Sequence, residues 1–301
     1  MDSRSTTPSP ALPLLLALAV HWDDCSVALG TAEGARTEIW SRQPERLAAA
    51  GTAGNERGQG SGPLASRDAL LLLDRLLVRT GTPLSTVDRL CFANGPGAFT
   101  SLRVAAGIIQ GLSLATSIPA VGICSLAALA GDGPDWRPAK SGEATTWLQL
   151  SAIDARMGEC YFGLHECRGG EHPKALIAPA VGSPSRAVEL FDAVLGHRAG
   201  FESQALPGGR TPIRLAGNAF ALLPDLADWA RGAGLDGEGA ALRSATAAAV
   251  LAVAASRGAP QGGPARSALP VYVRDKIALD IDEQKAGAAA RALALASRRP
   301  A

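Results

Sequence analysis

Residues 87–123 read VDRLCFANGPGAFTSLRVAAGIIQGLSLATSIPAVGI, and this stretch decides the fold class. It opens with an apolar strand pattern over 87–93 and turns sharply within the glycine-proline segment at 94–97. A helical pattern then runs over about 100–115, and a second short apolar strand follows at 120–123. A strand, a helix and a further strand joined by short turns indicate an α/β fold.

The same alternation extends in both directions along the chain. Three strand-like runs and a long amphipathic helix precede the stretch, and a hairpin, three helices and a further strand follow it. We therefore expect an α/β protein with two lobes, each a mixed sheet flanked by helices. The expected strands are 14–20, 25–30, 36–40, 147–154, 159–165, 213–216 and an extended piece at 271–273, and the expected helices are 64–78, 125–129, 185–195 and 244–257.

Composition shifts suggest where the lobes begin and end. Residues 1–13 are polar and proline-rich, which predicts a disordered lead-in. An N-terminal lobe is expected over 14–118, interrupted by a glycine-rich loop at 42–63 that is too poor in apolar residues to be buried. A C-terminal lobe is expected over 119–260, and the final segment, 261–301, could return to the N-terminal lobe.

Composition also excludes several classes of protein. The chain has 301 residues, is 47% hydrophobic and carries a formal net charge of +1, which excludes wholesale disorder and argues against a strongly basic nucleic-acid binder. Its five cysteines show no CxxC spacing and its four histidines no HxxxH, so neither a disulfide framework nor a metal site follows. A reducing compartment, the cytoplasm, is the simplest expectation. The apolar run 12–20 fits a buried strand better than a signal sequence, since no small-residue cleavage site follows it.

The loop before the central helix is the first candidate for chemistry. Gly95 and Gly97 would let a ligand approach the backbone closely, and Thr100 or Ser101 could cap a helix whose N-terminal N–H groups face an anion. The segment is neither a P-loop nor a GxGxxG fingerprint. It therefore predicts a possible anion or nucleotide loop, with a purely structural tight turn as the alternative.

Two helix faces are the second candidate. Leu71 and Val78 stand in the charged face of the helix 64–78, where packing within the chain gives no reason for them. The central helix presents a second such face on which only Arg103 is charged. Small residues there would let another helix approach closely, so we expect a partner interface, with stray surface apolar residues as the alternative. The residues of this second face are Arg103, Ala106, Gly107, Gln110 and Leu114.

Four motifs in order along the chain resemble the bacterial TsaB family. NGPGAFTSLR (94–103) resembles its GPGSFTGLR-like loop, and IDARMGECYF (153–162) resembles its IDARMGEVYW segment. PVYVRDKIA (270–278) resembles its C-terminal PVYLR piece, and LLALAVHWDDCSVAL (15–29) resembles its first hairpin. The resemblance covers residues from about 14 to 278.

The resemblance implies an actin-like, ribonuclease H-like fold with two similar lobes. It also implies a non-catalytic scaffold role with TsaD and the ATPase subunit TsaE, which together attach threonylcarbamoyl to adenosine 37 of tRNAs reading codons that begin with adenine. TsaD would be the direct partner, a homodimer is possible, and tRNA would be reached through the complex without any membrane. We expect no cofactor on this chain itself, with ATP and a divalent metal held by partner subunits.

The chain departs from the family at two positions with functional meaning. The family usually has Asp-Thr after its first strand, where the acid helps to hold a metal-nucleotide, but this chain has Ala19-Val20. The family often has a histidine where Ala65 stands. An actin-fold ATPase or phosphotransferase is therefore the alternative function, and Ala19 argues against it. Peptidase is an older label of the family, but the sequence shows no nucleophile–base pair. Asp154 and Glu159 could be an acid–base pair, or they could stabilise a turn.

Overall fold

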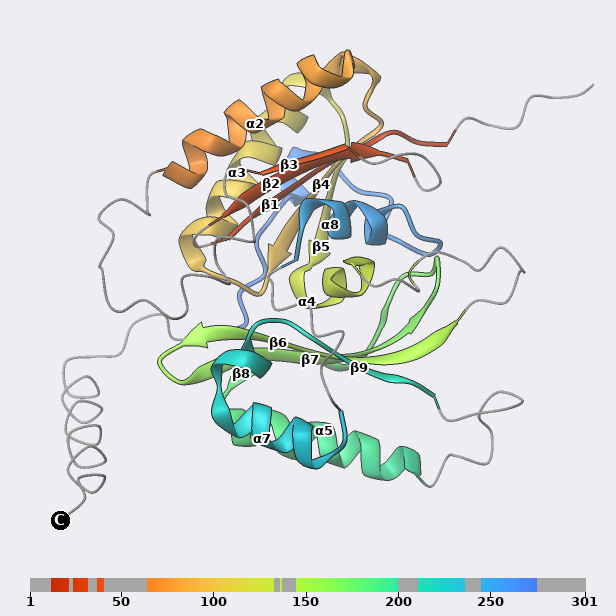
Figure 1. Cartoon of the computed structure of the whole chain (residues 1–301). Coiled ribbons are helices and arrows are strands. Elements are labelled where there is room, and N and C mark those ends of the chain that lie inside the picture. Colours follow the sequence, from red (N-terminus) through yellow and green to blue (C-terminus); the bar gives the residue numbers. More distant parts are fainter. Residues whose placement is uncertain are drawn as a thin grey trace, which may run out of the picture.

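The structure is a computed structural model that describes residues 12–21, 24–31, 37–40, 64–132, 136, 145–199, 211–235 and 245–274. Its elements stack in five layers: two sheets, short helices between them, and longer helices covering their outer faces (Figure 1). This layering requires central strands with apolar side chains on both faces, because both faces are covered.

The first sheet is mixed and has the strand order β3-β2-β1-β4-β5. Strand β2 is antiparallel to β1, whereas β4 is parallel to β1 and β5 is parallel to β4. All six residues of β1 are buried: Leu16 and Leu18 face the outer helices, and Ala17 and Ala19 face the inner ones. The strands are β1 (Leu15–Val20), β2 (Cys25–Gly30), β3 (Thr37–Trp40), β4 (Arg89–Gly95) and β5 (Ala120–Cys124).

The second sheet is also mixed and has the order β8-β7-β6-β9. Strands β6 and β7 form a long antiparallel hairpin, and β9 lies parallel to β6. The hairpin turns through positive φ angles at Arg156 (66°), Met157 (59°) and Gly158 (79°). The strands are β6 (Thr146–Arg156), β7 (Glu159–Arg168), β8 (Lys174–Gly182) and β9 (Ile213–Ala216).

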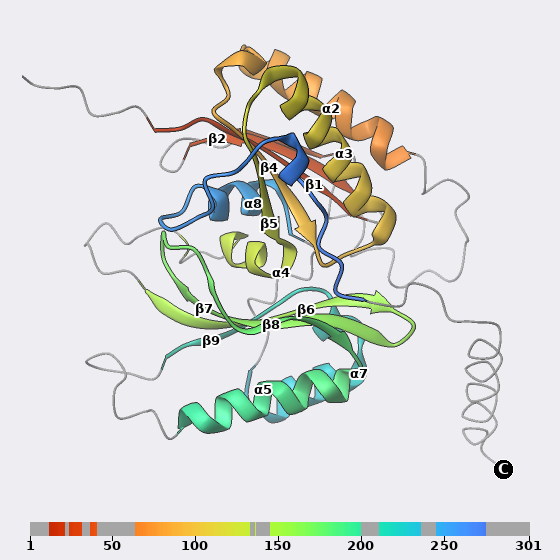
Figure 2. The ribbon, with the colours of Figure 1, turned by 180° about the vertical axis from the view of Figure 1, so that it is seen from behind.

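Helices cover both sheets from outside and separate them inside. Helices α2 and α3 lie on the outer face of the first sheet, and α5 and α7 lie on the outer face of the second (Figures 1 and 2). Helices α4 and α8 fill the layer between the sheets. The helices are α2 (Leu64–Thr80), α3 (Phe99–Thr116), α4 (Ser125–Ala128), α5 (Pro184–Ala199), α6 (Ala219–Leu222), α7 (Pro224–Gly232) and α8 (Ala247–Ala254), with 3-10 turns η2 (Leu84–Thr86), η3 (Leu129–Asp132) and η6 (Ala265–Ser267).

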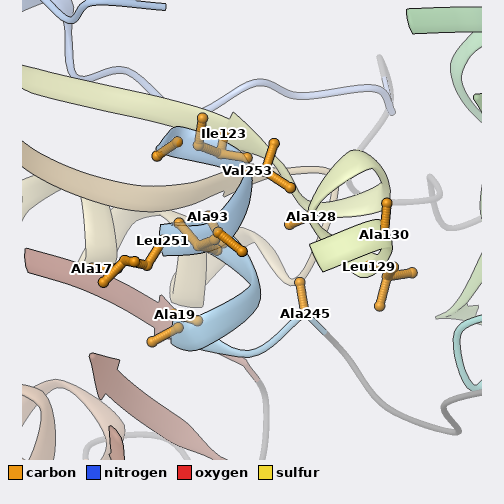
Figure 3. Packing of buried hydrophobic residues seen from close by; sticks show 14 of the residues in the cluster. Ala17, Ala19, Ala93, Ile123, Ala128, Leu129, Ala130, Ala245, Leu251 and Val253 are labelled. Carbon is orange, nitrogen blue, oxygen red and sulfur yellow. The ribbon is translucent and has the colours of Figure 1, made fainter. Parts of the chain in front are cut away.

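Alanines are frequent in the buried layer between the sheets, which also contains larger residues such as Trp136 and Trp147. Ala17 and Ala19 of β1 lie beside α8 in Figure 3, and Leu251 of α8 packs into the same buried cluster. At Gly131 an added Cβ would collide with the backbone of Ala249, so η3 and α8 approach at backbone distance. The close approach shows why the strand residues facing α8 are mainly alanines.

The two mixed sheets flanked by helices confirm the expected fold class. The expected boundary after residue 118 does not coincide with the change of sheet, because β5 pairs with β4 in the first sheet. Helix α8 likewise falls inside the expected C-terminal lobe yet packs against the first sheet. The expected loop at 42–63, most of the lead-in at 1–13 and residues 275–301 lie outside the described residues.

Two further expectations about the elements are corrected. Strand β8 and helices α6 and α7 were not expected, and the helix expected over 244–257 spans only Ala247–Ala254. The cap of that helix is Thr246, whose hydroxyl accepts a hydrogen bond from the Ala249 N–H at 2.9 Å. Within the described residues, no helix is both long enough and apolar enough to cross a bilayer.

Candidate partner interface

The loop at 94–97 joins β4 to α3 and lies against another part of the chain. An added Cβ at Gly95, whose φ is 127°, would collide with the carbonyl oxygen of Val271. The close backbone approach that Gly95 permits is therefore made by residue 271 of the same chain. At Gly97 an added Cβ would meet only the Leu102 side chain, at 3.5 Å.

The start of α3 lacks the predicted side-chain cap. Ala98 occupies the N-cap position, and no side chain accepts a hydrogen bond there. Thr100 is exposed and Ser101 is buried, so the expected capping by either residue is wrong. The four predicted loop residues do lie together at one end of α3, and an anion or nucleotide loop stays a prediction.

The buried side of α3 is rotated from the expected one. Ala106, expected on the outward face, is 3% exposed and belongs to the core under the helix. Gln110 is half-buried, and its Nε2 donates to the carbonyl oxygen of Ala268 at 2.9 Å. Both residues are covered because the chain returns along this flank of α3 at residues 265–272 (Figure 2).

The remaining outward face of α3 is a stripe of one arginine, two glycines and one leucine. Arg103, Gly107, Gly111 and Leu114 are spaced at four, four and three residues, so they line one side of the helix. Leu114 is 80% exposed, and within the described parts of the chain an added Cβ at either glycine would meet no atom within 4 Å. Helix axes can approach more closely at glycine than at larger residues. We call these four residues the α3 stripe.

Helix α2 lies beside α3 and adds apolar side chains to the same outer layer (Figure 1). Leu71 is 46% exposed and Val78 is 74% exposed, as expected from their place in the charged face. Leu70, on the same helix, is 53% exposed. Isolated exposed leucines are common, but several exposed apolar side chains on two adjacent helices are typical of an interface.

An aromatic and cationic cluster stands at the end of the α3 stripe. The Arg103 guanidinium carbon lies 3.8 Å from the centroid of the Phe99 ring, and its Nε donates to the Tyr272 hydroxyl at 3.0 Å. The centroids of the Phe99 and Tyr272 rings are 5.1 Å apart. An open groove of about 410 Å³ runs beside this cluster and is lined by Arg103, Ala106, Gly107, Gln110, Leu269, Pro270 and Tyr272.

Ala19 lies in the layer between the sheets and not at an open site. It is fully buried against the alanine-rich cluster around α8. A carboxylate at that position would lose its hydration without a cationic partner, which is strongly unfavourable. The residue that replaces the family's acid is therefore a packing residue here.

The two hairpin carboxylates have structural partners. Asp154 Oδ1 accepts a hydrogen bond from the Arg156 N–H at 2.9 Å, which fixes the turn. Glu159 forms an ion pair with Arg274, which comes from the far end of the chain. These contacts favour the turn interpretation of Asp154 and Glu159 over an acid–base pair.

The described cysteines are poorly suited to nucleophilic or metal chemistry. Burial raises the pKa of Cys25, Cys91, Cys160 and Cys167 to about 12, so these thiols stay protonated at neutral pH. Among the described residues, no three histidine, cysteine or acidic side chains come together in a way that could hold a metal ion.

Sequence reasoning missed the C-terminal contribution to this surface. Leu269, Val271 and Tyr272 are 58%, 48% and 43% exposed beside the α3 stripe. The signal was present in the apolar run LPVYV at 269–273, but helical or strand periodicity does not say which surface such a run joins.

Comparisons with known proteins place these features in a family. The family model described as "TsaD: tRNA N6-adenosine threonylcarbamoyltransferase" matches residues 65–256. The tRNA threonylcarbamoyladenosine biosynthesis protein TsaB of Haemophilus influenzae is 35% identical over 148 residues, covering 49% of this chain and 52% of that protein. Escherichia coli TsaB is 34% identical over 117 residues, covering 37% of this chain and 48% of that protein. The chain thus spans about half the length of these curated relatives.

A solved structure extends the likeness over most of the fold. A Pseudomonas aeruginosa protein, described as uncharacterized and similar to peptidase YeaZ, is 28% identical with a TM-score of 0.59. The match covers 87% of this chain and all of that one. Because the family model matches well over half of its residues, the chain belongs to the TsaD family.

Proposed function

We propose that this member of the TsaD family is a non-catalytic scaffold subunit in the synthesis of threonylcarbamoyladenosine at position 37 of tRNAs that read codons beginning with adenine. The similarity to TsaB proteins, whose names give this pathway, supports the proposal. The exposed apolar and small-residue face of α2 and α3 is the observation that carries it.

The direct partner in this proposal is the catalytic TsaD subunit, which would lay a helix pair against α2 and α3. The α3 stripe offers close approach at Gly107 and Gly111, and Leu114 and Val78 offer apolar area. A second copy of this chain could use the same face, since an isologous interface places one patch against itself. TsaE and tRNA would join through the assembled complex in the cytoplasm.

The scaffold role does not require chemistry on this chain. Ala19 is a buried packing residue, and four buried thiols have a pKa of about 12. We therefore expect ATP and a divalent metal to be held by partner subunits, with weak nucleotide binding here. The alternative function, an actin-fold ATPase or phosphotransferase, would show turnover of ATP by the isolated chain.

The deciding experiment substitutes Gly107→Glu and measures association with the TsaD subunit of the same organism by light scattering or calorimetry. We expect association to weaken by at least about tenfold, because a charged side chain replaces the point of closest helix approach. The thermal melt should be unchanged or slightly raised, since Gly107 has open space around it.

Gly196→Glu is the matched control. Gly196 is also an exposed helical glycine with no neighbour within 4 Å, but it lies on α5, on the far side of the second sheet. This variant should bind TsaD normally. Normal binding by Gly107→Glu would move the interface elsewhere, and unfolding of that variant would mean that α3 has been assigned the wrong outward face.

A further inference from the structure

The segment that follows α8 runs back and forth between the two lobes. Its first contact with the second lobe is at Arg257, whose N–H donates to Gly170 O at 2.9 Å and whose carbonyl accepts from the His172 N–H at 2.9 Å. The Arg257 side chain also reaches Glu171 at 3.4 Å. These contacts lie just beyond the C-terminal end of β7.

The segment then crosses to the first lobe. The backbones of Gly263 and Ala120 exchange two hydrogen bonds, of 2.8 and 2.9 Å, at the start of β5. At Gly262 an added Cβ would meet Val121 Cγ2 at 2.8 Å, so the segment lies tightly against this strand. Further on, Ala268 is 1% exposed and packs in the core beneath α3.

The next residues bind the loop and the helix at the edge of the partner face. The Val271 N–H donates to Asn94 O at 2.7 Å, immediately before the turn into α3. Tyr272 packs on Phe99 and accepts a hydrogen bond from Arg103, which is a member of the α3 stripe. Residues 271 and 272 therefore fix the start of α3.

Two residues later the segment reaches the second lobe again, at the opposite end of β7. Arg274 forms an ion pair with Glu159, and its Nη2 lies 3.4 Å from the Ala155 carbonyl oxygen. Its guanidinium also lies 5.9 Å from the Tyr161 ring centroid. The Arg274 side chain is only 22% exposed, so water screens this ion pair less than a fully exposed one.

We propose that residues 257–274 form a strap that holds the two lobes in one relative orientation and couples Arg103 on the partner face to the β6–β7 hairpin. The strap holds the second lobe at both ends of β7, a ten-residue strand of about 33 Å, and holds the first lobe between those two points. Two attachments that far apart resist rotation of one lobe against the other, which a single attachment would not. Arg103 and Glu159 belong to different lobes and do not touch, yet Tyr272 and Arg274 bind them from positions two residues apart in one short chain segment.

The test is hydrogen exchange of the isolated full-length chain, followed by mass spectrometry, without any partner. Arg274→Ala should speed exchange in the hairpin peptide spanning 154–162 by about fivefold, and also in the peptide that contains the Val271 amide. Arg103→Ala should speed exchange at Val271 and, through the strap, in the same hairpin peptide. If the strap acts as one unit, the double variant should speed exchange by less than the two single effects combined.

Arg186→Ala is the matched control, because Arg186 forms an i,i+3 ion pair with Glu189 inside α5 and touches neither the strap nor the partner face. It should leave both peptides unchanged. The proposal would be overturned if Arg274→Ala sped up exchange only in the hairpin peptide and Arg103→Ala sped up exchange only in α3. If Arg274→Ala lowers the melting temperature too far, Arg274→Lys replaces it, because lysine keeps the positive charge but lacks the planar guanidinium group. Exchange in the same two peptides then tests the proposal. Because no partner is present, the outcome is independent of the scaffold function.

Discussion

Two surfaces of the first lobe use small residues for close helix approach, and only one of them is filled by the part of the chain that the structure describes. On the inner face of the first sheet, α8 packs against alanines of β1, which are fully buried. On the outside of α3, a Cβ added at Gly107 or Gly111 would meet no atom of the other described residues within 4 Å, and Leu114 is 80% exposed. The difference shows that small residues alone do not distinguish a core from an interface. What distinguishes them is whether the same chain supplies the second helix.

The largest expected effect comes from placing a charge on the filled surface. Ala19→Asp should lower the free energy of unfolding by about 4 kcal/mol, because the carboxylate would be buried against α8 without a cation. Urea unfolding followed by circular dichroism measures this. Ala193→Asp, on the exposed side of α5, should cost less than about 1 kcal/mol. Equal stability of the two variants would mean that α8 does not close this face.

The next effect compares one leucine from each surface. Leu251→Ala should cost about 3 kcal/mol of unfolding free energy, because Leu251 is fully buried in α8 and its truncation leaves a cavity. Leu114→Ala should cost less than about 0.5 kcal/mol but should weaken association with TsaD. Denaturant unfolding and calorimetric titration of both variants give the comparison. A large loss of stability in Leu114→Ala would show that its side chain packs within the monomer.

A smaller effect concerns pH and the layer between the sheets. Burial, with a smaller contribution from neighbouring His172, lowers the pKa of His165 from its usual value of 6.5 to about 4. The imidazole is therefore neutral in the folded state, and its contribution to stability is present above pH 6.5 and is lost as pH falls toward 4. Between pH 7 and pH 5 this amounts to about 2 kcal/mol of unfolding free energy.

Comparing His165→Gln with the unaltered chain isolates this contribution. Unfolding by urea at pH 7, 6 and 5 should give a shallower loss of stability for the variant, since its side chain does not titrate. Parallel pH profiles of the two proteins would show that His165 carries its proton at its usual pKa and is not held in the buried layer.

The smallest expected effect is a gain in stability. Gly111→Ala should raise the free energy of unfolding by about 0.5–1 kcal/mol, because alanine favours the helix and the added methyl group meets no neighbour. Thermal melts of the isolated chain measure the gain. A loss of stability instead would mean that the α3 stripe is already covered in the monomer.

Sequence patterns predicted the helices and strands in which apolar residues recur at the spacing typical of that element. The strands β2 and β9 match their expected bounds, and β1, β4 and α2 are each within a few residues. Strand β8 was missed because Pro179 interrupts its apolar run at 175–181, and a proline within such a run argues against a central strand. Strand β8 is an edge strand with many half-exposed residues, where a proline is tolerated.

The candidate interface was predicted only in part, for a different physical reason. Gly107, Leu114, Leu71 and Val78 are exposed as their helical positions suggest. Ala106 is covered by a segment that lies about 160 residues later in the chain, and no periodicity within α3 reveals that contact. Helical spacing gives the faces of a helix but not which distant segment will cover one of them.

The late position of α8 has a consequence for how the protein is made. The strands of the first sheet are all translated by residue 124, but the helix that covers their inner face lies at 247–254. The second sheet, by contrast, comes from one contiguous stretch between residues 146 and 216. On the ribosome, the first lobe must therefore wait with one apolar face uncovered while the whole of the second is synthesised. The half of the molecule that is translated first is the half that finishes folding last.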